Sequence, residues 1–406
     1  MNILVLNCGS SSVKFQLIDS ETGHYKAKGL CERIGSEDAI SNYQIAGQDK
    51  IKETMPMQNH KVAIQKIIDN LLHANHGIIK SKDEIHAIGH RMVHGAEIFT
   101  HPVLIDAAVI EQTRKCCKLA PLHNPANLIG IESALEILPG IPQCGIYDTA
   151  FHQTMPRHAY LYAIPMSLYK KHGIRRYGFH GTSHQYVSEQ AAELLKMDYN
   201  KMKIITCHLG NGSSIAAIKE GKSVDTSMGM TPLEGLMMGT RCGDIDPALV
   251  HFIASEEKMS DADVTNILLN KKSGMLGVTG VSNDMRDVHD AIAAGNQDAK
   301  AGLDIFCYRL KKYIGSYIAA MNGVDVIVFT GGIGELDDIV REHTMKDLEW
   351  LGIKIDNKVN EGRKFEVTTL STSDSKVKVM VIPTNEEFMI ARETSRLVKS
   401  MNAGQQ

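Results

Sequence analysis

The pattern of apolar and polar positions predicts two β-hairpins with small residues at their tips. An apolar strand over residues 3–6 leads into Asn7-Cys8-Gly9-Ser10-Ser11-Ser12, and a second apolar strand follows it to Asp19. Residues 204–218 repeat this arrangement around Gly210-Asn211-Gly212. Backbone N–H groups and hydroxyls at such tips suit the oxygens of a phosphate chain. One Gly/Ser turn usually does no more than join two strands, but two of them in separate halves indicate nucleotide phosphates.

The remaining pattern alternates strands with helices, which predicts an α/β fold whose sheets are covered on both faces. A further strand over residues 326–330 ends in Gly331-Gly332, and residues 35–59 form a polar stretch with no predicted strand. The duplicated hairpin predicts two domains around a nucleotide cleft, residues 1–149 plus 385–406 and residues 150–384. Strands are expected over residues 85–95, 143–147 and 377–382, and helices over residues 60–76, 107–117, 126–138, 248–270, 287–322 and 385–399, the last capped by Thr384 or Asn385.

Composition agrees with a globular enzyme and excludes several other classes. The 406 residues exceed what one core usually holds. The net charge of −3 gives no basic footprint for nucleic acid or an anionic membrane. No apolar run approaches the roughly 20 residues that span a bilayer, and the first residues do not resemble a signal peptide. The eight cysteines form no C-x-x-C pair, which predicts reduced thiols and a cytoplasmic protein.

Four polar residues at predicted strand ends or in glycine-bearing loops are candidates for chemistry. Arg91 and Arg241 are either surface charges or donors to a phosphoryl group, for which a guanidinium is well shaped. Asp148 ends a strand, where an aspartate often only caps a helix or forms a turn. His180 lies between two glycines and serves either a ligand or the cap of the next helix. The segment Asn283-Asp284-Met285-Arg286 precedes a helix and is either its cap or a nucleoside contact.

Six blocks of sequence together resemble the acetokinase family. They are residues 4–14, 89–91, 177–184, 206–214, 238–241 and 383–387, in the family's order and over nearly the whole chain. The resemblance implies a duplicated ATPase fold of the actin, ribonuclease-H and sugar-kinase type. It also implies a homodimer that uses Mg²⁺ and ATP to phosphorylate acetate reversibly to acetyl phosphate.

The family's roles are carried over only onto matching positions. The resemblance implies that Asp148, His180, Arg241 and Arg91 are catalytic. It implies that substrate is bound by Arg91, Val93, Leu122, Phe179 and Pro232, the last four around the alkyl end. It implies that nucleotide is bound by Lys14, His208, Asn211, Gly212, Asp284, Met285, Arg286, Gly332 and Ile333. Asn7 and Glu386 would hold or orient Mg²⁺, a hard cation that takes oxygen ligands.

The chemistry implied by the resemblance needs no general base, because a carboxylate is already ionised at neutral pH. Catalysis would consist of positioning and charge stabilisation during direct in-line transfer. Three departures from the family pattern stand out. Ala96 replaces a usual glycine, Cys242 replaces a frequent serine, and Leu336 stands where asparagine is common beside the nucleoside.

Two alternatives remain at this point. A propionate-phosphorylating member of the same family differs only in pocket size, and one methylene is worth about 1–3 kcal/mol of discrimination. Val93 favours acetate, because propionate-preferring relatives tend to have a smaller residue there. A non-catalytic, actin-like nucleotide switch is disfavoured by the presence of Arg91, His180, Arg241 and Glu386. A dinucleotide-binding dehydrogenase is excluded, because Gly331-Gly332-Ile333-Gly334 does not open a βαβ unit near the start of the chain.

Overall fold

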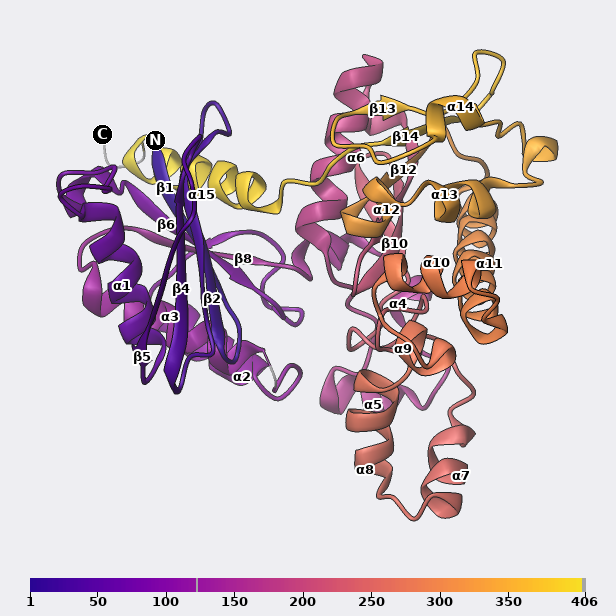
Figure 1. Ribbon diagram of the computed structural model, residues 1–406, viewed down its shortest axis with the longest axis horizontal. Coiled ribbons are helices and arrows are strands. Elements are labelled where there is room, and N and C mark those ends of the chain that lie inside the picture. Colours follow the sequence, from indigo (N-terminus) through magenta and orange to yellow (C-terminus); the bar gives the residue numbers. More distant parts are fainter. Residues whose placement is uncertain (122, 404–406) are drawn as a thin grey trace. The chain divides into compact units, whose positions relative to one another are not determined.

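The chain forms two compact units, each built around one mixed β-sheet (Figure 1). The structure is a computed structural model that describes residues 1–121 and 123–403. Unit 1 comprises Met1–Phe151 and Asn385–Gln406, and unit 2 comprises His152–Thr384. In the part of the chain that the structure describes, no helix has the length and apolar character needed to cross a membrane.

The sheet of unit 1 has eight strands in the order β5-β4-β3-β2-β1-β6-β8-β7. Strands β1 to β5 form an antiparallel meander, whereas β6 runs parallel to both β1 and β8. The strands are β1 (Asn2–Cys8), β2 (Ser12–Asp19), β3 (Tyr25–Glu32), β4 (Ser36–Ile45), β5 (Ile51–Met57), β6 (Ala87–Met92), β7 (Val103–Leu104) and β8 (Gln143–Tyr147).

Helices cover both faces of this sheet, because its strands present apolar side chains on each face. Leu4, Leu6 and Phe15 pack with α1 (His60–Leu72) and α3 (Asn124–Ile137). Ile3 and Val5 pack instead with α15 (Glu386–Ala403), which returns to unit 1 from the end of the chain. The remaining helices of this unit are η1 (Lys82–Glu84) and α2 (Ala107–Cys116), and η2 (Ala150–Thr154) lies at the boundary between the units.

The sheet of unit 2 has six strands in the order β11-β10-β9-β12-β14-β13. Its strands are β9 (Lys203–Leu209), β10 (Ser213–Lys219), β11 (Lys222–Thr226), β12 (Val326–Thr330), β13 (Thr368–Thr369) and β14 (Lys378–Val381). Both sheets share a five-strand core in which an antiparallel three-strand meander is followed by two parallel strands. This common order, β3-β2-β1-β6-β8 and β11-β10-β9-β12-β14, confirms the predicted duplication.

One face of the second sheet packs on α11 (Gln297–Met321) through a large apolar core. The opposite face meets α6 (Gly181–Leu195), whose His184 bonds Thr206 of β9. The other elements of this unit are α4 (Arg157–Tyr160), α5 (Met166–His172), η3 (Tyr199–Lys201), α7 (Ala248–Glu256), α8 (Asp261–Asp263), η4 (Val264–Leu269), α9 (Gly274–Thr279), α10 (Met285–Ala293), α12 (Gly331–Leu336), α13 (Asp338–Met345), η5 (Glu349–Leu351) and α14 (Asn357–Asn360).

Two sequence-based expectations about strands were wrong. The polar stretch over residues 35–59 contains β4 and β5, which extend the first sheet at its edge. Strand β5 is exposed over most of its length, so it lacks the apolar alternation that identifies a half-buried strand. The strand expected over residues 85–95 ends at Met92. The next two N–H groups donate to side chains, Val93 to Asn127 Oδ1 and His94 to Asn124 Oδ1.

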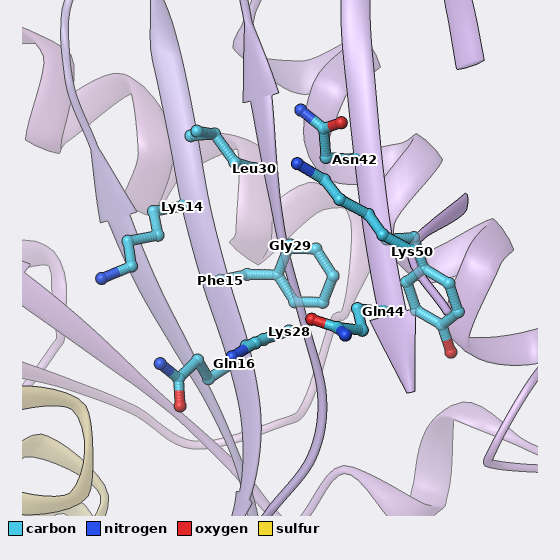
Figure 2. A pocket seen from close by; sticks show the side chains of 10 residues that line it. Lys14, Phe15, Gln16, Lys28, Gly29, Leu30, Asn42, Gln44 and Lys50 are labelled. Atoms are coloured by element: carbon cyan, nitrogen blue, oxygen red, sulfur yellow. The ribbon is translucent and has the colours of Figure 1, made fainter. Parts of the chain in front are cut away.

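A groove lies across β2, β3 and β4 on the first sheet (Figure 2). Gly29 lies in it, paired with Phe15 of β2 and Tyr43 of β4. A Cβ on Gly29 would lie 2.5 Å from the Phe15 ring, so glycine is required for the ring to cover this strand. Lys14 and Lys28 also line the groove, as Figure 2 shows.

Candidate active site

In unit 1, the parallel strands bring candidate residues to one edge of the sheet. Asn7 is the next-to-last residue of β1, Arg91 holds the same place on β6, and Asp148 directly follows β8. Strand side chains alternate between the faces. Asn7 continues the alternate positions of Ile3 and Val5, and the register of β1 with β6 gives Arg91 the same face. The carboxyl ends of three adjacent strands therefore direct an amide, a guanidinium and a carboxylate to the face that α15 covers.

Arg91 and Asp148 form a two-point ion pair. Arg91 Nε donates to Asp148 Oδ1 at 3.1 Å, and Arg91 Nη2 donates to Oδ2 at 2.7 Å. Burial raises the pKa of the Asp148 carboxyl to about 6, an effect that Arg91 opposes and the Glu386 charge reinforces. The Asp148 charge in turn raises the Arg91 pKa. The fork geometry fixes the plane of the guanidinium, which rules out the simple turn-former interpretation of Asp148.

The start of α15 lies at the same edge. A Cβ on Gly89 of β6 would lie 2.7 Å from Ile390 Cγ2, so only glycine lets α15 approach this closely. Asn385 caps the helix by accepting from Phe388 N–H at 3.0 Å, as predicted. Glu386, the first residue of α15, has a buried Oε1 with no hydrogen-bond partner among the described residues. Its neighbour Glu387 pairs with Lys14 of β2.

The segment after β6 includes two residues that the sequence singled out. Val93 is partly exposed just beyond the strand, with its N–H held by Asn127. Ala96 has φ +49°, a left-handed conformation that favours glycine. The backbone geometry thus gives a physical reason for the glycine that Ala96 replaces. Leu122, expected at the alkyl end of the substrate, lies outside the described residues.

In unit 2, two cationic or polar groups converge on the tip of the second hairpin. A Cβ on Gly212 would lie 3.4 Å from Arg241 Nη1 and 3.6 Å from His180 Nε2. The guanidinium also donates to Pro232 O at 3.2 Å, and burial lowers the Arg241 pKa. Neither side chain is an ordinary surface charge, since both face the backbone that the sequence predicts for phosphate.

His180 is held by its neighbours in a left-handed conformation with φ +56°. Its ring stacks on that of His208 at 4.2 Å between centroids, and its Nδ1 lies 2.9 Å from Ser214 Oγ. The residue before it, Phe179, is buried, and its carbonyl lies 3.0 Å from His152 Nε2. His180 immediately precedes α6 and makes no side-chain capping bond, so its side chain does not serve as the helix cap.

The candidate nucleoside loop connects to the hairpin tip. Asn283 Nδ2 donates to Asn211 Oδ1 at 3.0 Å. Asp284 caps α10 and pairs with Arg286, which lowers the Asp284 pKa to about 2. Met285 is 6% exposed and packs in the core. A contact from Met285 to a nucleoside would therefore come from its backbone.

The other candidate nucleoside contacts lie at the start of α12. Gly331 has φ +77°, and a Cβ there would lie 2.7 Å from Leu209 O. Gly331 therefore lets the turn after β12 pack closely against the end of β9. A Cβ on the next residue, Gly332, would have no atom within 4 Å. Ile333 follows and is partly buried against the core. Leu336, one of the departures, ends this short helix.

Sequence reasoning missed the residues that support these loops. Glu335 Oε1 accepts from Gly331 N–H at 2.8 Å and Thr384 N–H at 3.1 Å, which connects α12 to the segment that follows β14. Arg341 is fully buried and donates to the carbonyls of Gly334, Glu335, Asn360 and Gly362. A buried arginine that serves only carbonyls leaves no trace in a local pattern. Cys242, another of the departures from the family pattern, is a partly buried thiol beside apolar residues.

Comparison with known proteins identifies the family of the chain. A model of the acetokinase family matches residues 2–392. The chain belongs to this family. An acetate kinase of Thermoanaerobacter pseudethanolicus is 56% identical over 402 residues, which cover 99% of this chain and all of that protein. An acetate kinase of Clostridioides difficile is 53% identical over 400 residues, 98% of this chain and all of that protein.

Two solved structures of similar proteins match this chain over nearly its full length. A crystal structure of Porphyromonas gingivalis acetate kinase superposes with a TM-score of 0.95 at 50% identity, covering 98% of this chain and 99% of that one. A propionate kinase from Francisella tularensis gives a TM-score of 0.90 at 45% identity, covering 97% and 99%. This acetokinase is therefore an enzyme, a kinase, and the predictions of its family and of its duplicated α/β fold are confirmed.

Proposed function

We propose that this acetokinase catalyses the reversible transfer of the γ-phosphoryl group of ATP to acetate, which forms acetyl phosphate. The observation that carries the proposal is the approach of His180 Nε2 and Arg241 Nη1 to the Gly212 tip. Fixed donors aimed at a phosphate-binding turn stabilise the charge of a phosphoryl group in flight. Acetate is chosen because relatives named acetate kinase reach 56% identity, whereas the propionate kinase structure stands at 45%.

Arg91 would bind the acetate carboxylate and an oxygen of the transferring group. Its guanidinium plane is set by the two bonds to Asp148, so Asp148 would position the substrate oxygen through Arg91. The attacking oxygen carries its own negative charge, because acetate is ionised well below pH 7. The residues then supply orientation and charge balance, and direct transfer needs no phosphorylated side chain.

Magnesium fits unit 1 through Asn7 and Glu386. A buried carboxylate oxygen without a partner, Glu386 Oε1, is the kind of group that a hard cation or its water satisfies. The described residues contain no cluster of three or more His, Cys, Asp or Glu side chains arranged for a metal. Few protein ligands suit Mg²⁺, which keeps waters and takes other oxygens from nucleotide phosphates. The ion would neutralise phosphate charge when bound.

The nucleotide would be held mainly by backbone and polar groups of unit 2. The hairpin tip would lie along the phosphates, with His208 beside it, and the loop before α10 and the start of α12 would contact the nucleoside. Lys14 of unit 1 would add a charge to the phosphates, although it now pairs with Glu387. The proposed residues are Lys14, His208, Asn211, Gly212, Asp284, Met285, Arg286, Gly332 and Ile333.

Truncating Val93 is expected to favour propionate. Val93, Phe179 and Pro232 would contact the methyl group of acetate. Val93→Ala makes room for about one extra methylene, so the ratio of kcat/KM should shift toward propionate by about 10-fold, mainly through KM. Steady-state kinetics with both acids measure this shift. Val103→Ala removes the same atoms from β7 and should leave the ratio unchanged. Equal losses for both acids in Val93→Ala would make Val93 an ordinary structural residue.

A hydroxamate assay for acyl phosphate tests the function itself. Acetate, propionate and butyrate are compared side by side with ATP and Mg²⁺, and acetate should give the highest kcat/KM. An enzyme that makes acyl phosphate faster from propionate would move the chain to the alternative acid. Absence of acyl phosphate from every acid would leave the nucleotide-switch alternative.

We also propose a homodimer and a cytoplasmic location. Large apolar side chains stand exposed on helices of unit 2, with Phe252 of α7 at 62% and Tyr308 of α11 at 64%. Exposed apolar residues that lie together are typical of surfaces that another chain covers, and Ile305, also exposed, lies on the same face of α11 as Tyr308. Sedimentation should give twice the mass of the chain. The eight cysteines are free thiols, six of them buried, which supports a reducing compartment.

A further inference from the structure

A chain of buried side chains leads away from His180 into the interior of unit 2. Thr206 Oγ1 lies 2.7 Å from His184 Nδ1, and His184 Nε2 lies 2.7 Å from Ser214 Oγ. Ser214 Oγ also lies 2.9 Å from His180 Nδ1. Thr206, His184 and Ser214 are all fully buried. Each link in this chain is a hydrogen bond that must have one donor and one acceptor.

The fold brings these groups together from three elements. Thr206 lies on β9 and Ser214 on β10, where the antiparallel register pairs Thr206 with Ala216 and Ser214 with His208. His184 lies in the first turn of α6, four residues after His180, and its backbone N–H donates to the His180 carbonyl at 2.9 Å. The His184 ring therefore bonds one side chain from each strand and lies near the His180 ring. Residues three or four apart on a helix share one face.

Proton counting leaves three arrangements for this hydrogen-bonded chain. A neutral imidazole has one N–H and one acceptor nitrogen, and a hydroxyl has one proton. Burial, together with His152 and His208, holds the pKa of His184 well below its usual range, so this ring is neutral. In the first, every proton points toward His180. In the second, every proton points toward Thr206. In the third, both imidazoles donate to Ser214 Oγ, and the Ser214 hydroxyl proton is left over.

The buried hydroxyl groups of Thr206 and Ser214 select between these arrangements of hydrogen bonds. Thr206 Oγ1 has no other hydrogen-bond partner among the described residues. If the protons pointed toward Thr206, its own hydroxyl proton would be buried without an acceptor, which costs about 1–3 kcal/mol. If both imidazoles donated to Ser214, the proton of that fully buried hydroxyl would have no acceptor among the described residues, at a similar cost. If they point toward His180, Thr206 donates to His184 Nδ1, His184 Nε2–H donates to Ser214, and Ser214 donates to His180 Nδ1. Every buried group is then satisfied.

We propose that Thr206, His184 and Ser214 are positioning residues that hold His180 in the tautomer protonated at Nε2. That nitrogen is the one that faces the hairpin tip, 3.6 Å from a Cβ placed on Gly212. The chain thus presents an N–H donor, and not a lone pair, to the phosphoryl group. This inference rests on the proposed phosphoryl transfer for its purpose, but the tautomer itself does not depend on it. The tautomer of a histidine is commonly set by what its other nitrogen bonds.

Nitrogen NMR of the histidine rings tests the proposal directly. The full-length enzyme is labelled with ¹⁵N-histidine, and long-range ¹H–¹⁵N spectra are recorded without ligands at pH 8.5, above the ordinary imidazole pKa. His180 and His184 should both carry the proton on Nε2. Thr206→Val keeps the shape but removes the hydroxyl, so a population protonated at Nδ1 should appear at both rings. Thr206→Ser keeps the hydroxyl and should restore the single tautomer.

Kinetics of the same variants give a second readout. Thr206→Val should lower kcat about tenfold while KM for acetate changes less than twofold, and Thr206→Ser should recover most of this loss. Ser214→Ala interrupts the chain next to His180 and should mix its tautomers. Ser188→Ala serves as the matched control, because Ser188 is a buried hydroxyl on the same helix that bonds Gln185 O and Tyr199 but not His180.

The spectrum of the unmodified enzyme decides the matter even if a variant fails to fold. A His180 proton on Nδ1, or on both nitrogens, would overturn the proposal. So would an unchanged His180 signal in folded Thr206→Val and Ser214→Ala. Loss of acyl phosphate formation in the unmodified enzyme would instead overturn the proposed function and leave the tautomer result standing.

Discussion

Alanine in place of Arg241 is expected to lower kcat by a factor on the order of 10³. The guanidinium approaches the hairpin tip that would hold the phosphates, and burial already lowers its pKa. A fixed charge in such a place stabilises the transferring group more than it stabilises bound substrate, so kcat falls more than KM rises. Steady-state kinetics at saturating ATP measure the loss.

Arg91→Ala should cause a similar loss of kcat, but it carries a second cost. Removing the guanidinium leaves the Asp148 carboxylate buried without its partner, which destabilises unit 1 by about 3–5 kcal/mol. The double variant Arg91→Ala/Asp148→Asn removes that charge and should recover most of the stability without recovering activity. Thermal unfolding and kinetics on the same preparations separate the two effects.

A surface pair supplies the control for both arginines. Arg33 and Asp38 form an exposed ion pair, with more than half of each side chain accessible. Arg33→Ala should leave kcat unchanged and should change the free energy of unfolding by no more than about 1 kcal/mol. If Arg91→Ala and Arg241→Ala keep more than about a tenth of the original kcat, both arginines are structural charges and the proposed roles are wrong.

Much of the fold could be predicted because many of its elements are determined by the residues of one short stretch of sequence. The two hairpins alternate apolar and polar residues around small tips, and β8 lies over the predicted residues 143–147. The cap at Asn385 and the acidic pair after it mark the start of α15. Strand β5 escaped notice because an edge strand with both faces exposed carries no apolar period.

The candidate site divides in the same way. Charged residues at strand ends and in glycine-bearing loops were visible, and within unit 1 the parallel register brings Asn7, Arg91 and Asp148 to one edge. The groups that set their orientation were not visible. Asn127 holds the Val93 N–H and Ser214 meets His180 only after helices pack on the sheets. A polar residue in a helix or strand comes to orient a site residue only through tertiary contacts. The sequence pattern around that polar residue does not reveal those contacts.

Glu386→Gln is expected to raise the Mg²⁺ concentration needed for half-maximal activity by tenfold or more, or to abolish turnover. The substitution keeps the shape and removes the negative charge, and Mg²⁺ prefers a carboxylate oxygen to a neutral amide. Because Glu386 Oε1 bonds no described residue, the thermal midpoint should change little. The lost favourable charge at the start of α15 is worth about a few tenths of a kcal/mol, and removing a partly buried charge, which is costly to desolvate, offsets that loss.

The neighbouring residue makes this test specific. Glu387→Gln removes a charge from the same helix turn, but Glu387 pairs with Lys14 and its carboxylate has a partner. A general effect of charge on α15 would alter the Mg²⁺ requirement in both variants. A metal role for Glu386 alters it in Glu386→Gln alone, and titration of activity with Mg²⁺ at fixed ATP separates the two. Normal Mg²⁺ dependence in Glu386→Gln would reduce Glu386 to a partner of the helix dipole and leave Asn7 without the carboxylate that its proposed role requires.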